Sequence, residues 1–336
     1  MLENKKIVIL TEGGFTFGFG HITRSKSIAQ SFNKFEIQST FIINGDASIT
    51  DILNPFPYII FDWTKETDRL LGLLKNIDLI LIDSIEISDE LIKKLERLNI
   101  KIVFIDDYKR KNILDAGIVI DWTVLSDEKD YFIPKKADVT YILGSKYAPL
   151  REEFLNAKQN VIKKDISSIM VTFGGSDVKN LTPRILNILA SSYPNIQKNI
   201  VIGAGFQNIL QIDKIKDKNT NLIFNANAKT MLKLMQDNDI AIASGGQTLY
   251  ELALVGTPTV AILLVENAKD DTEGWSKVGS IKSLGWWNDE DIFDNLILTI
   301  DAMKDKKVRS KMQDSAKNYI FSNGGKMLVE KIMENL

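Results

Sequence analysis

The sequence has no cysteine and a single histidine among its 336 residues, and these two shortages exclude whole classes of chemistry. Without cysteine there is no disulfide framework and no thiolate nucleophile. With only one histidine as well, a zinc site built from nitrogen and sulfur ligands is excluded. A Mg²⁺ ion held by carboxylates stays open, but no motif supports it. We therefore expect no metal and no cofactor.

Long apolar runs and an excess of one charge are also absent. The 42 basic and 44 acidic residues are mixed along the chain and leave a net charge of −2, so we expect no nucleic-acid partner. No run approaches the roughly 20 apolar residues of a membrane span. The apolar stretch at residues 7–10 is too short for a signal peptide. These features predict a protein of the reducing cytoplasm.

The sequence does contain two successive series of short apolar runs, which alternate with segments of helical spacing. The runs are residues 7–10, 40–43, 79–82, 102–105 and 118–120, then 169–173, 200–202, 222–224, 240–242 and 260–264. Such continuous runs are typical of strands buried on both faces of a parallel sheet. The chain is also long enough for two domains. We predict an α/β protein of two Rossmann-like, doubly wound domains, residues 1–155 and 156–336, with a helical tail on the second. The ligand is expected in the cleft between them.

The one histidine lies in the segment Gly18-Phe19-Gly20-His21-Ile22-Thr23-Arg24, just after the first predicted strand. A glycine-rich turn between a strand and a helix lets a phosphate or nucleotide approach the backbone. An imidazole there can move a proton near neutral pH. Arg24 lies one helical turn further on, where it could meet a phosphate or a carboxylate. From these residues alone, a catalytic histidine and a structural turn with an incidental histidine both stay open.

Two similar turns occur in the second half. Ser244-Gly245-Gly246-Gln247-Thr248 follows a predicted strand and opens a helix, with Glu251 one turn inside. Backbone amides at such a turn can hold a diphosphate, and Glu251 could accept hydrogen bonds from ribose. A tight turn with a surface glutamate is the alternative. The turn at Gly174 admits either a phosphate or a plain chain reversal, and Asp177 is predicted to cap a helix.

Acidic residues end two of the first-domain strands: Asp83 in one case and the pair Asp106-Asp107 in the other. Carboxylates at the carboxyl edge of a sheet could orient a base or bind a cation. Helix caps and solvated loops explain the same pattern, so both interpretations stay open.

Together these segments resemble a known family across nearly the whole chain. The motifs occur in the order Gly18-x-Gly-His21-x-x-Arg24, Leu143-Gly-Ser-Lys-Tyr-Ala-Pro-Leu-Arg-Glu-Glu-Phe154, Phe173-Gly-Gly-Ser-Asp177 with Asn180-Leu-Thr182, and Ser244-Gly-Gly to Glu251. The series resembles the UDP-2,4-diacetamido-2,4,6-trideoxy-β-L-altropyranose hydrolases of pseudaminic acid biosynthesis, relatives of the MurG glycosyltransferase.

The resemblance implies a GT-B architecture, two Rossmann-like domains with a UDP-sugar in the cleft. It implies that the Ser244–Thr248 turn and Gly174 bind the nucleotide phosphates, and that Glu251 binds the ribose. It gives His21 the role of general base on water that attacks the anomeric carbon, supported by Arg24 and Asp83. Substrate-binding positions carried over from the motifs are Gly18, Gly20, Tyr147, Arg151 and Asn267.

Two departures from the family lie on the sugar side of the site. The family tends to carry Asp-x-Tyr where this chain has Asp83-Ser84-Ile85, and Asn-Gln where it has Asn267-Ala268. The leading hypothesis is a nucleotide-sugar hydrolase of a bacterial surface-glycan pathway. The alternative is a glycosyltransferase in which the hydroxyl of an acceptor glycan replaces water. A non-enzymatic nucleotide-sugar-binding protein is a third hypothesis.

Overall fold

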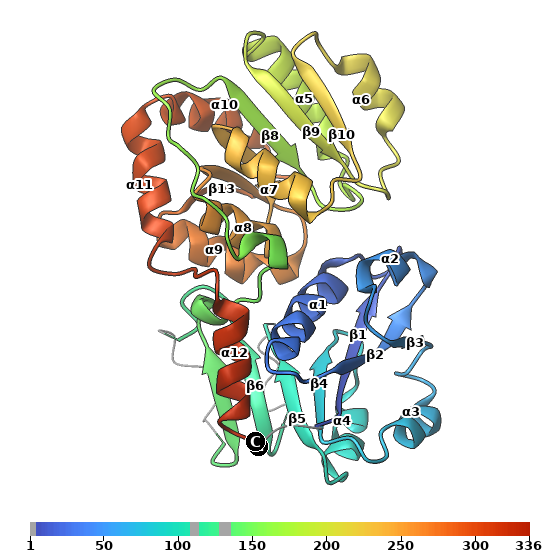
Figure 1. Ribbon diagram of the computed structural model, residues 1–336. Helices are drawn as coiled ribbons and strands as arrows, with labels where there is room; N and C mark the ends of the chain where they lie inside the picture. The colour runs from blue at the N-terminus through green and yellow to red at the C-terminus, as the bar shows by residue number, and fades with distance from the viewer. Residues whose placement is uncertain (1–4, 108–113, 128–135) are drawn as a thin grey trace. The chain divides into compact units, whose positions relative to one another are not determined.

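The computed structural model describes residues 5–107, 114–127 and 136–336, and the chain divides into two compact units (Figure 1). The N-terminal unit comprises Met1–Glu152 together with Asn323–Leu336, and the C-terminal unit comprises Glu153–Ser322. Each unit has its own parallel sheet with helices packed on it, and each is described by itself.

In the described residues, the N-terminal unit is built on a seven-stranded parallel sheet with the order β3-β2-β1-β4-β5-β6-β7. Its strands are β1 (Ile7–Gly13), β2 (Ser39–Gly45), β3 (Tyr58–Ile60), β4 (Leu79–Asp83), β5 (Lys101–Ile105), β6 (Gly117–Asp121) and β7 (Val139–Leu143). Its helices are α1 (Gly20–Asn33), α2 (Thr50–Leu53), α3 (Thr67–Leu73), α4 (Asp89–Glu96) and α12 (Gly324–Met333), with short 3₁₀ turns η1 (Ala47–Ile49) and η2 (Ser145–Tyr147). A third 3₁₀ turn, η3 (Glu152–Phe154), crosses the division between the units.

The central strands β1, β4 and β6 are buried along their whole length. This is the pattern that continuous apolar runs predict, because helices cover both faces of a parallel sheet. The apolar side chains of these strands and of α4 form one continuous core.

The C-terminal unit repeats the scheme on a six-stranded parallel sheet with the order β10-β9-β8-β11-β12-β13. Its strands are β8 (Ser168–Thr172), β9 (Gln197–Ile202), β10 (Thr220–Phe224), β11 (Ile240–Ser244), β12 (Thr259–Leu263) and β13 (Ile281–Trp286). Its helices are α5 (Leu181–Ser192), α6 (Ile209–Ile215), α7 (Ala228–Asp237), α8 (Gln247–Val255), α9 (Lys269–Lys277), α10 (Ile292–Met303) and α11 (Lys306–Ala316), with the 3₁₀ turn η4 (Glu266–Ala268).

The last helix differs from the expected division. We expected residues 156–336 to form the second domain with its helical tail, but α12 belongs to the N-terminal unit, where it packs on α1 and η2. The glycines at its start explain the close packing. A Cβ at Gly324 would lie 2.5 Å from the carbonyl oxygen of Ala148, and one at Gly325 would lie 2.5 Å from Oγ of Ser31.

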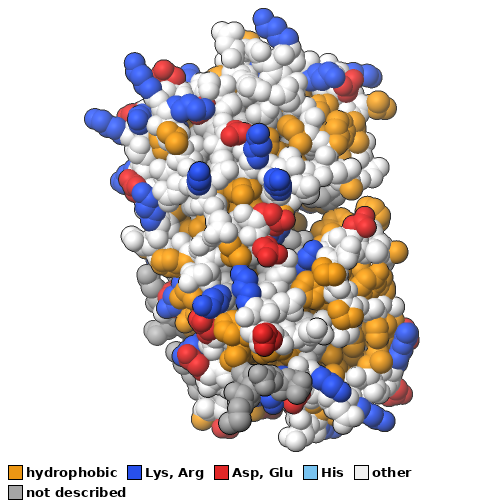
Figure 2. Space-filling view, viewed as in Figure 1, with side chains coloured by type: hydrophobic (Ala, Val, Ile, Leu, Met, Phe, Trp, Pro, Cys, Tyr) orange, Lys and Arg blue, Asp and Glu red, His pale blue; other side chains and the backbone are white. Residues whose placement is uncertain are grey.

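The face drawn in Figure 2 carries lysine and arginine side chains interspersed with aspartate and glutamate. Mixed signs of this kind produce no broad field of one charge. Of the helices in the described residues, none is both long and apolar enough to cross a membrane.

Candidate functional site

Two loops meet at the carboxyl edge of the N-terminal sheet, where the strand order reverses. β1 lies between β2 and β4, and Thr11 of β1 pairs with Asp83 at the end of β4. The loop from β1 to α1 is therefore next to the residues that follow β4. Open α/β sheets bind their ligands at such a switch point.

The β1–α1 loop is a tight turn that leads into the N-terminus of α1. The Gly14 N–H donates to the carbonyl of Gly18 at 3.0 Å, and the Phe15 N–H donates to the Asp46 carboxylate at 2.9 Å. Gly14 has a φ of +130°, and a Cβ there would lie 2.3 Å from that carboxylate, so only glycine fits. The turn places His21 in the first turn of α1.

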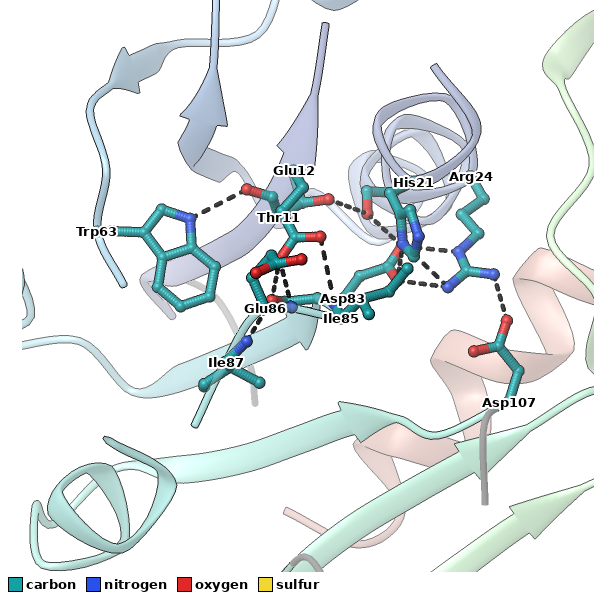
Figure 3. Close-up of polar contacts among 12 residues, drawn as sticks. Thr11, Glu12, His21, Arg24, Trp63, Asp83, Ile85, Glu86, Ile87 and Asp107 are labelled. Carbon is teal, nitrogen blue, oxygen red and sulfur yellow. Dashed lines mark hydrogen bonds and ion pairs between the residues drawn. The ribbon is translucent and has the colours of Figure 1, made fainter. Parts of the chain in front are cut away.

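A buried network of acid and guanidinium groups holds His21 (Figure 3). Its Nδ1 lies 2.7 Å from Oδ1 of Asp83. Arg24 donates to Asp83 from Nε at 2.8 Å and from Nη2 at 2.5 Å, and its Nη1 donates to Asp107 at 2.5 Å. The Ser25 hydroxyl donates to Asp83 at 3.0 Å. Three residues of one helix therefore donate to a single carboxylate at the end of the neighbouring strand.

The charges in this network are fixed by their surroundings. Burial by itself raises the pKa of Asp83, but the charge of Arg24 and the hydrogen bonds from Arg24 and His21 outweigh it and hold that pKa well below its usual range. Burial lowers the pKa of Arg24, but Asp107 and Asp83 raise it well above its usual value. The carboxylate is therefore ionised and the guanidinium charged.

The ionised carboxylate determines the tautomer of His21. A carboxylate can only accept a hydrogen bond, so the 2.7 Å contact requires that Nδ1 carries the proton and donates it to Asp83. Arg24 Nη2 lies further from Nδ1, at 3.2 Å. Because Nδ1 already carries a proton, it offers no lone pair for Arg24 to donate to. The lone pair is thus on Nε2, to which no protein group among the described residues is hydrogen-bonded. A neutral imidazole in this state can accept a proton at Nε2.

Glu12, in β1, is a buried acid to which we assigned no role from the sequence. Its carboxylate accepts hydrogen bonds from the Ser84 hydroxyl and from the N–H groups of Ile85 and Glu86. The one signal in the sequence is an acidic residue two positions after the apolar run of the first strand. Acids at that position are equally common in solvated loops, so the signal is weak.

The carboxyl edge of the C-terminal sheet carries the second glycine turn. β8 lies between β9 and β11, so the loops after β8 and β11 are neighbours at the switch point. A Cβ at Gly245 would lie 2.5 Å from Oγ1 of Thr272 and 2.7 Å from Cβ of Ala268. Gly246, with a φ of +105°, has no atom within 4 Å of the Cβ position. The turn is thus packed on one side and open at Gly246, where α8 begins.

The loop after β8 is also open at its first glycine. Gly174 has a φ of +69°, and no atom lies within 4 Å of its Cβ position. The Asp177 carboxylate accepts hydrogen bonds from the N–H groups of Leu181 and Thr182, both at 2.9 Å. The Asp177 side chain therefore caps the first N–H groups of α5, as predicted, although the N-cap position itself is Asn180, whose side chain makes no capping bond.

The structure brings together some of the residues predicted from the sequence. His21, Arg24 and Asp83 form one network. Gly18 lies in the loop before α1 and Gly20 is the first residue of α1, both with open space around their Cβ positions. Among the described residues, no group of three histidine or acidic side chains is placed to hold a metal ion.

The other predicted residues lie elsewhere in the two units. Ser244 ends β11, and Gln247 and Thr248 open α8, in which Glu251 is buried. Asn267 lies in η4, next to the Ala268 that packs on Gly245. Tyr147 ends η2, and Arg151 directly precedes η3.

Known proteins resemble this chain in sequence. An uncharacterized protein of Methanocaldococcus jannaschii, MJ1062, is 30% identical over 268 residues, which are 76% of this chain and 55% of that protein. SpsG, a spore coat polysaccharide biosynthesis protein of Bacillus subtilis, is 26% identical over 284 residues, 82% of this chain and 83% of SpsG.

A third relative combines two activities in its name. The pseudaminic acid cytidylyltransferase and UDP-2,4-diacetamido-2,4,6-trideoxy-β-L-altropyranose hydrolase of Helicobacter pylori is 24% identical over 318 residues, 94% of this chain and 53% of that protein. The chain therefore spans about half the length of this relative and of MJ1062. No family model matches the chain.

Solved structures resemble the chain along its whole length. MurG of Acinetobacter baumannii aligns with a TM-score of 0.69 at 15% identity, covering 98% of this chain and 100% of MurG. HepE of Anabaena in complex with UDP-glucose aligns with a TM-score of 0.63 at 13% identity, covering 99% of this chain and 100% of HepE. At such low sequence identity these alignments show a similarity of fold alone. The chain has the α/β fold of the GT-B glycosyltransferases, with two Rossmann-like units, as the sequence predicted.

Proposed function

We propose that the chain is a nucleotide-sugar hydrolase that releases UDP and a free amino-sugar, with His21 as general base. One observation carries the proposal: Asp83 fixes the His21 tautomer that leaves the lone pair on Nε2, at a switch point of the sheet. A buried acid that orients a histidine in this way is the arrangement of general-base catalysis. The names of SpsG and of the Helicobacter pylori protein, both of which refer to sugar biosynthesis, support the substrate class.

In the proposed reaction a water molecule attacks the anomeric carbon while Nε2 takes one of its protons. The new bond joins the water oxygen to that carbon, and the bond from the carbon to the diphosphate oxygen breaks, so that UDP leaves with the electron pair. Asp83 stabilises the imidazolium that forms. Base catalysis of this kind contributes about 10²–10⁴-fold.

We assign the diphosphate to the turn from Ser244 to Thr248. The backbone is open at Gly246, and the N-terminus of α8 presents the positive end of the helix dipole to an anion. Stabilising the leaving diphosphate is expected to be the largest single contribution to the rate. Gly174, in the neighbouring open loop, is proposed to flank the same phosphates.

The experiment is to incubate the protein with N-acetylated sugars linked to UDP, in the absence of an acceptor glycan, and to follow UDP release by phosphorus NMR. Release that disappears in His21→Ala and persists in a surface control, Lys65→Ala, supports the hydrolase. The Lys65 side chain is exposed, forms an ion pair with Asp62 and does not contact the His21 network. Full activity of His21→Ala would overturn the assignment of the base.

A glycosyltransferase is the second candidate, because the same base can take a proton from an acceptor hydroxyl. Two observations favour it. The solved structures MurG and HepE share the GT-B fold, and an exposed isoleucine, Ile85, stands where the resembling hydrolases carry a tyrosine. UDP release only after addition of an acceptor glycan would select the transferase. Binding of the UDP-sugar without turnover in either condition would leave a binding protein.

A further inference from the structure

A second buried carboxylate lies beside the His21 network without belonging to it. β1 continues beyond the end of β4, because Thr11 pairs with Asp83 as the last pair between the two strands. Glu12 therefore extends past β4 and meets the chain as it leaves that strand. Figure 3 shows its contacts next to those of Asp83. Only 1% of Glu12 is exposed.

The Glu12 carboxylate collects donors from consecutive residues of the β4–α4 loop. The Ser84 hydroxyl and the Glu86 N–H, at 3.0 Å, donate to Oε1, and the Ile85 N–H donates to Oε2 at 3.2 Å. The Ser84 oxygen in turn accepts from the Ile87 N–H at 3.0 Å. Every residue from Ser84 to Ile87 is therefore anchored, directly or through Ser84, to one side chain.

The charge of Glu12 matters for this anchoring. Among the residues that the structure describes, no lysine or arginine forms an ion pair with Glu12, so its partners are the loop donors. A buried carboxylate needs such hydrogen bonds, and both of its oxygens accept. A glutamine at the same place would turn one oxygen into an NH₂ group and set it against an N–H or O–H donor. The loop is therefore matched to a carboxylate and not to an amide.

We infer that Glu12 is a positioning residue for the Asp83–His21 pair. Ser84 directly follows Asp83 in the chain, so the anchored loop sets where β4 ends and how the Asp83 carboxylate meets Nδ1 at 2.7 Å. A misplacement of about 1 Å at a reacting group can cost roughly 10²-fold in rate. The kinetic part of this inference rests on the proposed function, but the part that concerns the imidazole tautomer does not.

The single histidine makes the inference testable without a known substrate. Protein labelled with [¹⁵N]histidine, with any affinity tag removed, gives one pair of imidazole nitrogen signals, and their shifts report which nitrogen carries the proton. We would compare wild type with Glu12→Gln and Ser84→Ala. Glu86→Gln is the matched control, since the Glu86 side chain is exposed in the same loop and only its backbone contacts Glu12.

In wild type and in Glu86→Gln, we expect the Nδ1–H tautomer. In Glu12→Gln we expect a mixture of tautomers and a kcat lowered about 10- to 100-fold, with KM changed less than about threefold. Ser84→Ala keeps the carboxylate and removes one donor, so it should show the same changes more weakly and serves if Glu12→Gln fails to fold.

Failure of the proposed function and failure of the inference about Glu12 give different results. A wild-type protein that turns over no nucleotide-sugar contradicts the proposed function and leaves the tautomer readout intact as the test of Glu12. Glu12→Gln and Ser84→Ala proteins that are folded and have a wild-type imidazole spectrum would overturn the inference, whatever the activity.

Discussion

Replacement of Asp83 by asparagine tests the proposed base most directly. The carboxylate lies 2.7 Å from Nδ1 of His21 and is almost fully buried. Two unit charges about 4 Å apart attract by roughly 4 kcal/mol at an effective dielectric constant of 20, and Asp83→Asn removes this attraction for the imidazolium. That energy corresponds to roughly a 10³-fold lower kcat. The asparagine NH₂ group can also donate to Nδ1, which moves the proton to Nε2 and removes the base.

The assay is UDP release from the UDP-sugar that wild type turns over, together with the imidazole ¹⁵N spectrum. Asp121→Asn is the matched control, because Asp121 is an equally buried aspartate at the end of β6 that accepts from the Thr123 N–H. We expect a large loss of kcat and the opposite tautomer in Asp83→Asn, and neither change in the control. Asp83→Asn activity within threefold of wild type would refute the role of the carboxylate.

Three further predictions concern stability and ligand binding. Because the pKa of Asp83 is held below its usual range, its ionised form stabilises the fold above an unfolded pKa of about 4, and this contribution is lost as the pH falls toward the folded value. The stability gap between wild type and Asp83→Asn, measured by urea unfolding, should therefore narrow by about 1 kcal/mol from pH 6 to pH 3. Gly45→Ala should lower the free energy of unfolding by about 2 kcal/mol or more, because its Cβ would lie 1.8 Å from the Gly13 carbonyl oxygen. Gly72→Ala, at an exposed position of α3, should leave the melting temperature no lower than that of wild type. At Gly246 an alanine Cβ meets no atom, but the φ of +105° is strained for any residue other than glycine. Gly246→Ala should therefore lower the free energy of unfolding by about 1–3 kcal/mol and weaken UDP binding measured by calorimetry. Unchanged affinity for UDP would contradict the assignment of this turn.

Most of the strands that could be predicted from the sequence have both faces covered, although the edge strand β10, which is partly exposed, was predicted as well. β1, β4 and β5 read as continuous apolar runs because helices pack on each side of them. Three strands were missed: β3, β7 and β13. All three lie at the edge of a sheet and keep partly exposed residues. An edge strand has one neighbour and less burial, so its sequence loses the apolar run that marks a strand.

The sequence predicted some residues of the site but not how they are brought together. Asp83 was a candidate because it ends a buried strand, but the sequence could not show that β4 lies beside β1, since strand order depends on tertiary packing. Glu12 was missed because its partners, a serine hydroxyl and two backbone N–H groups, lie in a loop 72 to 74 residues away.

The charges around His21 show why one histidine suffices for either proposed reaction. With a neutral imidazole, Asp83, Asp107 and Arg24 together carry one negative charge, and the transfer of a proton to Nε2 brings the group to neutrality. The network is therefore arranged to receive a proton, and it does not depend on whether the proton comes from water or from a sugar hydroxyl. Hydrolase and transferase must consequently differ in what reaches Nε2. Ile85, which is exposed in the loop after Asp83 and takes no part in this charge balance, is the residue we propose to test for that choice.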